Sequence, residues 1–190
     1  VLCLIALLIP LNFNLLTIIL ALGSMPLAFT YPLMKRYTYW PQLFLGITFN
    51  YGLILGWTAV HGQINLIAVL FYLGAIFWTL GYDTIYGYQD IKDDEIIGLK
   101  STSIKFKGKE IKFLYICYSF LLIFFILGGY FMEFSFIYFI FLLFSFLHLF
   151  FYQIKNFNYN DPEKCLKIFR SNNFFGLIIF VNILIAKLHI

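Results

Sequence analysis

Long apolar stretches separated by short polar connections run through the whole chain. A helix that crosses a bilayer needs about 20 mostly apolar residues, because a rise of about 1.5 Å per residue must cover about 30 Å of hydrocarbon. The stretches are continuously apolar, without the period of two of a membrane-spanning strand. About seven helices are predicted, at residues 1–11, 14–34, 41–60, 64–86, 112–130, 134–153 and 172–189. The pattern therefore predicts an all-α fold, a polytopic transmembrane helical bundle.

The composition supports a membrane protein and excludes two other classes. Of the 190 residues, 62% are hydrophobic and only 12% are charged, and the chain contains 25 Phe and 14 Tyr. Ordinary soluble domains have about 25% charged residues, so this chain is not predicted to be soluble. It is too apolar to be disordered. Cys3, Cys117 and Cys165 have no CxxC spacing, so we interpret them as packing residues rather than disulfide or zinc ligands.

The positive charges are distributed on one side of the predicted bundle. If the helices alternate in direction, the loops at 35–40, 87–111 and 154–171 share one side of the membrane. Twelve Lys and Arg residues fall on or next to that side: Lys35, Arg36, Lys92, Lys100, Lys105, Lys107, Lys109, Lys112, Lys155, Lys164, Lys167 and Arg170. Only Lys187 falls on the other side. This bias predicts that the basic side faces the cytoplasm. It also accounts for the net charge of +4 without a nucleic-acid partner.

Residues 1–190 are predicted to form a single transmembrane domain, because no repeat or linker divides them. The chain begins at Val1 inside an apolar run, without the charged region and cleavage site of a signal peptide. We therefore expect the domain to be incomplete at its N-terminus, with residues 1–11 as the end of a longer helix.

Acidic residues gather where the predicted helix 64–86 leaves the membrane. If this helix continues through the acidic stretch at 100° per residue, Asp83, Tyr86, Asp90 and Asp94 share an arc of about 80°. Asp90 and Asp94 are one turn apart, which suits Mg²⁺ held by two carboxylates and substrate phosphates. Carboxylates at the depth of Asp83 usually face a polar cavity or a partner. Asp93 and Glu95, which are also in the cluster, are instead read as solvated.

Two further polar elements lie on the same side as the acidic cluster. In the segment 31–38, Tyr31 and Lys35 are four residues apart, and Lys35 is the counter-charge expected for a diphosphate beside Mg²⁺. Arg36 could serve the diphosphate or only the topology. In the segment 98–102, Lys100 and two hydroxyl groups could reach the same phosphates.

Three segments carry a resemblance to a known family. YDTIYGYQDIKDDEIIGLKST (82–102) resembles the second Asp-rich motif of the UbiA-type intramembrane prenyltransferases, and YPLMKRYTYWPQLFLG (31–46) resembles their YxxxK element. SNNFFGL (171–177) also resembles the branch that prenylates 4-hydroxybenzoate in ubiquinone biosynthesis. This family has nine transmembrane helices and a first Asp-rich motif. No acid precedes Asp83 here, so the chain resembles the C-terminal two-thirds of such a protein.

The resemblance implies a Mg²⁺-dependent transfer of a polyprenyl group from polyprenyl diphosphate to the ring of 4-hydroxybenzoate. Asp90 and Asp94 match the metal-binding pair, and Lys35 with Tyr31 matches the residues that hold the departing diphosphate. Asp83 matches a deeper acid facing the acceptor or the allylic cation. Tyr86, Lys100 and Arg36 are the remaining candidate substrate contacts. The isoprenoid tail is expected in an apolar groove open to lipid.

The resemblance also implies a location. We expect the bacterial inner membrane, with the active site facing the cytoplasm, rather than the mitochondrial inner membrane.

Three alternative functions remain open for such a chain. A CDP-alcohol phosphotransferase needs DG and AR dipeptides, and neither occurs in the chain. A cation-coupled transporter would use Asp83, although transporters usually place acids near the middle of the bilayer. A non-catalytic structural membrane protein is the third possibility. Among the other polar residues, Asn50 and Asn182 are expected to form interhelical hydrogen bonds, and His148 is expected to pack.

Overall fold

The computed structural model describes residues 8–188, and within them the chain is helical and has no strand. Six segments are long and apolar enough to cross a membrane. They are α2 (Leu15–Thr30) with η2 (Tyr31–Leu33) and α3 (Met34–Tyr37), α4 (Pro41–Phe49) with α5 (Tyr51–His61), α6 (Leu66–Tyr86), α9 (Glu110–Phe131), α10 (Phe136–Phe146) with the π-helical η3 (Leu147–Ile154), and α11 (Pro162–Leu188). Three shorter helices, η1 (Pro10–Asn12), α7 (Ile91–Ile97) and α8 (Thr102–Lys105), complete the described chain. The all-α membrane bundle predicted from the sequence is confirmed.

The predicted helices differ from the structure mainly at two places, and a third prediction is largely untested. Most of the predicted segment 1–11 lies outside the described residues. The predicted span 41–60 is interrupted at Asn50, between α4 and α5, and the last helix begins at Pro162 instead of residue 172. The early start of α11 has a local cause, because the side chain of Asp161 accepts a hydrogen bond from the Lys164 amide and caps the helix.

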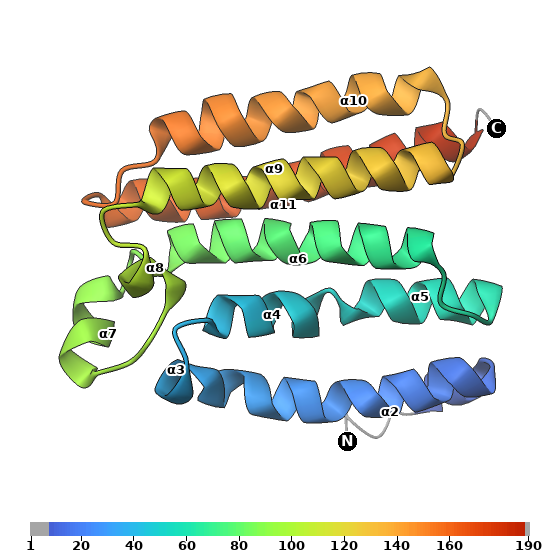
Figure 1. The fold of residues 1–190 in the computed structure, drawn as a ribbon, viewed down its shortest axis with the longest axis horizontal. Coiled ribbons are helices and arrows are strands. Elements are labelled where there is room, and N and C mark those ends of the chain that lie inside the picture. The colour runs from blue at the N-terminus through green and yellow to red at the C-terminus, as the bar shows by residue number, and fades with distance from the viewer. Residues whose placement is uncertain (1–7, 189–190) are drawn as a thin grey trace.

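Helix α6 lies at the centre of the bundle and contacts α9, α4, α5 and α11 (Figure 1). Asn65 caps the N-terminus of α6, because its side chain accepts a hydrogen bond from the Ala68 amide at 3.0 Å. Helices α2 and α10 lie towards the outside of the same arrangement, while α7 and α8 project from one end of it (Figure 1). Because α6 is central, the residues at its C-terminal end lie next to several connecting segments, among them α7 and α8 (Figure 1).

Small residues allow α6 and α9 to approach closely. A Cβ atom added to Gly74 of α6 would lie 2.5 Å from the ring of Phe125, and one added to Gly128 of α9 would lie 2.9 Å from the ring of Phe71. A Cβ on Gly81 would collide with Tyr118. In lipid, helix association depends on such close packing, because lipid tails are as apolar as the helix surfaces and the hydrophobic effect gives no driving force.

A buried polar network fixes α11 against α6 and α9. Asn172 of α11 accepts hydrogen bonds from Trp78 Nε1 at 2.8 Å and from Gln153 Nε2 at 3.0 Å, and Gln153 in turn accepts one from the hydroxyl of Tyr118. The expected interhelical bonds are also present: Asn50 donates to the Ala75 carbonyl oxygen and to Thr79, and Asn182 donates to the Tyr138 carbonyl oxygen.

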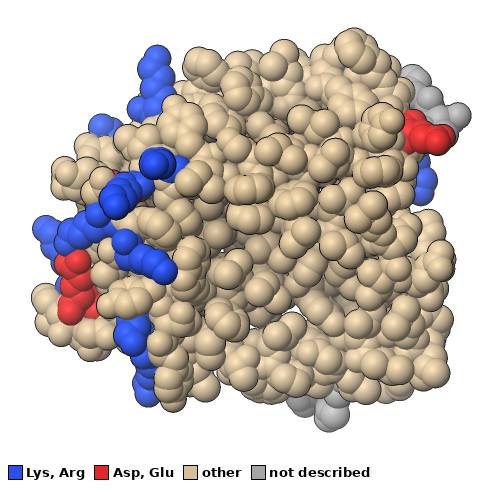
Figure 2. All heavy atoms as spheres, in the orientation of Figure 1, with Lys and Arg blue, Asp and Glu red and all other residues tan. Residues whose placement is uncertain are grey.

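Lys and Arg side chains cluster at the end of the bundle that carries α3, α7 and α8, and we call this the basic end (Figure 2). The opposite end shows few charges in this view (Figure 2). The first turns of α9 and α11 also lie at the basic end (Figure 1). The one-sided distribution expected from the sequence is therefore present in space.

Candidate functional site

The two polar elements predicted from the sequence meet at the basic end. The Nζ atom of Lys35, in α3, lies 3.4 Å from Oδ2 of Asp94, in α7. The Asp94 side chain is 10% exposed, whereas that of Lys35 is 43% exposed. The lysine therefore covers the carboxylate and still presents part of its own surface to the outside.

Backbone and side-chain contacts of Lys100 reinforce this meeting. The Lys100 amide donates a hydrogen bond of 2.8 Å to the Lys35 carbonyl oxygen. Its ammonium group donates one of 3.3 Å to the Tyr37 carbonyl oxygen and lies 5.7 Å from the ring centre of Tyr39. Lys100 thus joins the segment after α7 to α3, so that Lys35, Asp94 and Lys100 belong to one local assembly.

Asp83 and Tyr31 lie next to this assembly, at the membrane ends of α6 and α2. Asp83 is in the last turn of α6, within electrostatic range of both Lys35 and Tyr31. Its side chain makes no hydrogen bond or ion pair with any of the described residues. Asp83, Tyr31 and Lys35 are therefore brought together, and the Asp83 carboxylate is left for another partner.

The continuous helix expected through the acidic cluster is wrong. Helix α6 ends at Tyr86, and α7 begins at Ile91 with Asp90 as its N-terminal cap position. At the break, the chain packs closely at Gly87, where a Cβ would collide with the Ser103 hydroxyl. The shared arc of Asp83, Asp90 and Asp94 is lost with the break.

Asp90 and Asp94 retain the spacing of one turn, because the Asp94 amide donates to the Asp90 carbonyl oxygen at 2.9 Å. Their environments differ, since Asp90 is exposed whereas Asp94 is buried. Helix α7 ends at Gly98, whose φ of 78° is in the left-handed region that favours glycine. The turn at Gly98 directs the chain back towards Lys35.

The remaining candidate substrate residues are accessible. Tyr86 is 38% exposed, and its ring centre lies 4.5 Å from that of Phe169 in α11. Arg36 is exposed in the last turn of α3 and forms no ion pair in the part of the chain that the structure describes. Neither residue contacts Asp94, so both lie at the edge of the assembly around Lys35.

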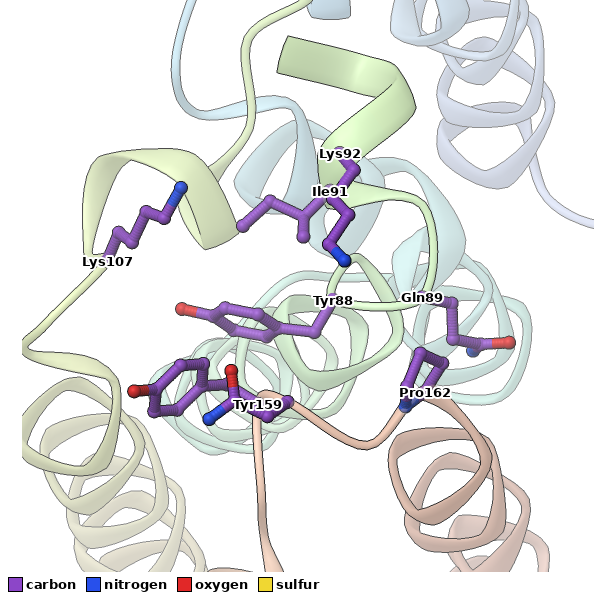
Figure 3. Close-up of a pocket in the computed structure, with 8 residues that line it drawn as sticks. Tyr88, Gln89, Ile91, Lys92, Lys107, Tyr159 and Pro162 are labelled. Carbon is purple, nitrogen blue, oxygen red and sulfur yellow. The ribbon is translucent and has the colours of Figure 1, made fainter.

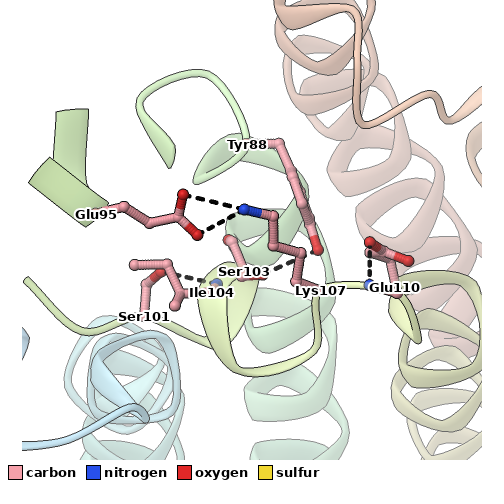
Figure 4. A network of polar contacts seen from close by, with 8 residues as sticks. Tyr88, Glu95, Ser101, Ser103, Ile104, Lys107 and Glu110 are labelled. Atoms are coloured by element: carbon pink, nitrogen blue, oxygen red, sulfur yellow. Dashed lines mark hydrogen bonds and ion pairs between the residues drawn. The ribbon is translucent and has the colours of Figure 1, made fainter. Parts of the chain in front are cut away.

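The two hydroxyl groups of the 98–102 segment, which the sequence suggested could reach the phosphates, both have hydrogen-bond partners within the protein. Ser101 caps α8 by accepting a hydrogen bond from the Ile104 amide at 3.2 Å (Figure 4). The Thr102 hydroxyl is buried and lies 2.6 Å from that of Thr84. These hydroxyl groups fix α8 beneath the end of α6, so only Lys100 of this segment remains a candidate substrate contact.

The candidate metal ligands are the carboxylates of Asp90 and Asp94. Among the described residues, no group of three or more His, Cys, Asp or Glu side chains is arranged to hold a metal ion. A complete protein cage for a cation is therefore not formed by residues 8–188. Mg²⁺, however, is usually held by one or two carboxylates, with phosphate oxygens and water as its other ligands. The exposed Asp90 and the neighbouring Asp94 fit that mode of binding.

An aromatic face on α6 was missed in the sequence. Trp78, Tyr82 and Tyr86 are spaced four residues apart and so lie on one side of the helix. The ring centre of Trp78 lies 5.4 Å from that of Tyr82 and 4.9 Å from that of Phe175 in α11. The spacing of four was the signal that could have revealed this face.

The aromatic face leads to a cavity of about 460 Å³ in the apolar half of the bundle. The cavity is walled by residues of α5, α6, α9 and α11, and Trp78 lies at its border with the aromatic face. Its other lining residues are largely apolar, such as Phe71, Phe125 and Ile179. Trp78, at one end of the aromatic face, thus borders a space suited to an apolar chain.

Comparison with known proteins gives a consistent result. The chain matches the UbiA prenyltransferase family over residues 1–181. It is 43% identical to a mitochondrial 4-hydroxybenzoate polyprenyltransferase of Bos taurus over 92% of this chain and 47% of the relative. The corresponding human protein is 40% identical over 92% and 47%, and 4-hydroxybenzoate geranyltransferase 2 of Lithospermum erythrorhizon is 41% identical over 93% and 58%. The chain therefore spans about half the length of the curated relatives it matches. No solved structure matches it at a significant level.

Proposed function

The chain belongs to the UbiA prenyltransferase family, and on this premise we propose that it forms part of an enzyme that transfers a polyprenyl group to 4-hydroxybenzoate in ubiquinone biosynthesis. The donor is a polyprenyl diphosphate and the reaction requires Mg²⁺. The observation that carries the proposal is the meeting of Lys35 with Asp94, because it joins a cation for diphosphate to carboxylates for a metal. The names of the relatives support the aromatic acceptor.

Lys35 is assigned to the diphosphate of the donor. Its ammonium group is held by Asp94 at 3.4 Å but remains partly exposed, so a phosphate oxygen can approach it from the outside. Lys100 is tied to the Tyr37 carbonyl oxygen nearby and adds a second positive charge, and Arg36 adds a third at the edge. Hydrogen bonds to phosphate from such cations are stronger than those between neutral groups.

Asp90 and Asp94 are the residues that would hold Mg²⁺. When bound, this ion would neutralise charge that develops on the departing diphosphate. The ammonium group of Lys35 orients the Asp94 carboxylate, whereas Asp90 is exposed, so a metal ion can reach it without displacing a partner. The pair thus supplies one preorganised and one accessible carboxylate.

The transfer itself breaks the bond between the allylic carbon and the diphosphate oxygen. The electron pair of this bond leaves with the diphosphate, and a ring carbon ortho to the acceptor hydroxyl bonds to the allylic carbon and then loses its proton. Asp83 is assigned to the acceptor or the allylic cation, because it lies deeper than Asp94 and has no partner among the described residues. Tyr31 and Tyr86 flank this level, and aromatic rings favour a nearby cation.

The isoprenoid tail is assigned to the aromatic face of α6 and the cavity beyond it. Trp78 borders this cavity, which has a volume of about 460 Å³ and largely apolar walls. A long isoprenoid tail is already in lipid, so close packing against these walls favours its binding here, while the diphosphate remains at the basic end.

The membrane orientation follows from the charges. The basic end faces the cytoplasm of a bacterium or the equivalent matrix side of a mitochondrion. The sequence led us to expect the bacterial inner membrane. Several relatives are named as mitochondrial proteins, and these names favour the mitochondrial inner membrane. The site at Lys35 faces the same side in either membrane.

The structure and the family match both argue against the transporter alternative. Asp83 lies in the last turn of α6, at the basic end, whereas a cation-coupled transporter places its carboxylate near the middle of the bilayer. The family match covers residues 1–181 and is to prenyltransferases.

The proposal can be tested with the native protein in membranes supplied with polyprenyl diphosphate and 4-hydroxybenzoate. Lys35→Gln is expected to lower transfer by about 100-fold, because a charge that stabilises the leaving group is lost. Lys167→Gln is the matched control, since it removes one positive charge from α11 at the basic end. Equal activity of the two variants would exclude Lys35 from the reaction.

A further inference from the structure

A polar pocket lies at the basic end, with a volume of about 210 Å³. Its walls come from four segments: the residues after α6, the start of α7, the residue Lys107 after α8, and the turn that leads into α11. Lys92 and Lys107 lie on one side of the pocket and Tyr159 and Pro162 on the other, with Tyr88 between them (Figure 3).

This pocket is distinct from the site at Asp94. Lys92 and Asp94 are two residues apart on α7 and therefore project about 200° from each other around the helix. Asp94 faces Lys35 of α3, and neither of these residues lines the pocket. Helix α7 thus separates two polar sites.

The lining of the pocket is rich in hydrogen-bond donors. Lys92 and Lys107 contribute ammonium groups, Gln89 and Asn160 contribute amides, and Tyr159 contributes a phenol, whereas no carboxylate lines the pocket. The Nε2 atom of Gln89 is buried and has no hydrogen-bond partner in the described chain. A buried donor without a partner costs about 1–3 kcal/mol, so an acceptor in the pocket would remove a penalty.

The acidic and phenolic groups near the pocket do not neutralise Lys92. Glu95 binds Lys107 at 2.7 and 3.0 Å (Figure 4), and Asp161 is occupied by Lys164 at 3.5 Å. Lys92 forms no ion pair within residues 8–188. Burial, together with the nearby Glu110, raises the pKa of the Tyr88 phenol, so Tyr88 stays neutral. Its hydroxyl donates to the Ser103 carbonyl oxygen at 3.0 Å.

The size of the pocket limits the ligand. Its volume of about 210 Å³ is below the range of about 300–1,000 Å³ of pockets that enclose drug-sized ligands. A phosphate group is a small acceptor of negative charge that suits two lysines and several neutral donors. Basic pockets between helices at this membrane face are also typical sites for anionic lipid headgroups.

We propose that this pocket binds a phosphate group, either as free phosphate or as the headgroup of an anionic phospholipid. The bound phosphate joins Lys92 of α7 to Lys107 and to the turn at Tyr159 and Asn160. It thereby holds α7, the helix that carries Asp94, against the ends of α9 and α11. The pocket is an anion site that supports the position of α7 and does not contact the reacting groups.

The test measures binding and not transfer, so it is independent of the proposed function. The native protein is exchanged into phosphatidylcholine nanodiscs, and hydrogen exchange of residues 91–97 is followed while inorganic phosphate replaces chloride at constant ionic strength. A second arm uses nanodiscs with phosphatidylglycerol and no free phosphate. Lys92→Gln is compared with Lys112→Gln, which removes an exposed charge outside the pocket.

Phosphate or phosphatidylglycerol is expected to slow exchange in α7, and Lys92→Gln is expected to weaken the response about tenfold, because a hydrogen bond to a charged group is lost. Lys112→Gln should behave as the unchanged protein. A response to phosphatidylglycerol alone identifies the lipid headgroup as the source, whereas a response to both identifies any phosphate. No response in the unchanged protein, or equal weakening in the two variants, would overturn the proposal.

Discussion

The ammonium nitrogen of Lys35 lies 3.4 Å from Oδ2 of Asp94, although 59 positions separate the two residues along the chain. One belongs to the short helix α3 at the end of the first described span, and the other to α7 after the central helix α6. The Lys100 amide, bonded to the Lys35 carbonyl oxygen at 2.8 Å, fixes the same approach through the backbone. The site therefore depends on how two loops at the basic end fold together.

The first prediction concerns this pair. Lys35→Gln and Asp94→Asn should each lower prenyl transfer by about 100-fold or more, because each removes a charge from the diphosphate and metal site. The double variant should lose little more than either single variant, since the two residues act together. Stability should change by about 1 kcal/mol or less for Lys35→Gln, because Lys35 is partly exposed. Rates at matched protein levels and thermal unfolding check both statements, and additive losses in the double variant would contradict the coupling.

The second prediction concerns the metal. Asp90→Asn should raise the Mg²⁺ concentration needed for half-maximal transfer, because Asp90 is the accessible carboxylate of the pair. Asp93→Asn removes an exposed carboxylate from the same helix and should leave this concentration within about twofold of that of the unchanged protein. A titration of the rate with Mg²⁺ compares them. The assignment fails if both variants show the same requirement as the unchanged protein.

The third prediction concerns packing between α6 and α9. Gly81→Ala should destabilise the protein by about 1–3 kcal/mol, because the added Cβ collides with the ring of Tyr118. Gly52→Ala is the control, since no atom lies within 4 Å of the Cβ position there, and alanine is favoured over glycine within a helix by about 1 kcal/mol. Thermal unfolding in detergent should therefore separate the two variants in opposite directions. Equal melting temperatures would show that α6 and α9 are not packed this closely.

The fourth prediction separates structural from substrate-binding residues in the 98–102 segment. Thr102→Val should lower stability by about 1–2 kcal/mol, because its buried hydroxyl bond with Thr84 is lost, and should leave the KM for polyprenyl diphosphate unchanged. Lys100→Gln should raise that KM, since a charge near the diphosphate is removed. Melting temperatures and KM values of both variants form the test. A raised KM for Thr102→Val at normal stability would restore its hydroxyl as a substrate contact.

Much of the fold could be predicted from the sequence because a bilayer imposes a length on apolar segments. The spans 64–86 and 112–130 match α6 and α9 within two residues at each end. The early start of α11 could not be predicted from hydropathy, because its first turns carry charges such as Lys164 and Lys167 that are equally typical of a loop. The break at Asn50 was hidden for the opposite reason, since apolar residues continue on both sides of it.

The candidate site was only partly predictable. The sequence brought Tyr31, Lys35 and Asp83 to one side of the membrane, and the structure places them together. The predicted arc of carboxylates is wrong because α6 ends at Tyr86, next to Gly87, which packs closely against Ser103 of a later segment. The burial of Asp94 against Lys35 is tertiary as well. Neither the contact of Gly87 with Ser103 nor that of Asp94 with Lys35 can be predicted from the periodicity of the local sequence.

The central claim is that the site at Lys35 and Asp94 transfers a polyprenyl group to 4-hydroxybenzoate. Its most direct test supplies isotopically labelled 4-hydroxybenzoate and polyprenyl diphosphate to membranes with the native protein, and mass spectrometry then detects the labelled, ring-prenylated acid. The account predicts product with the unchanged protein and Mg²⁺, and about 100-fold less with Asp94→Asn at the same protein level. Equal product from the two proteins, or none from the unchanged protein, would contradict it.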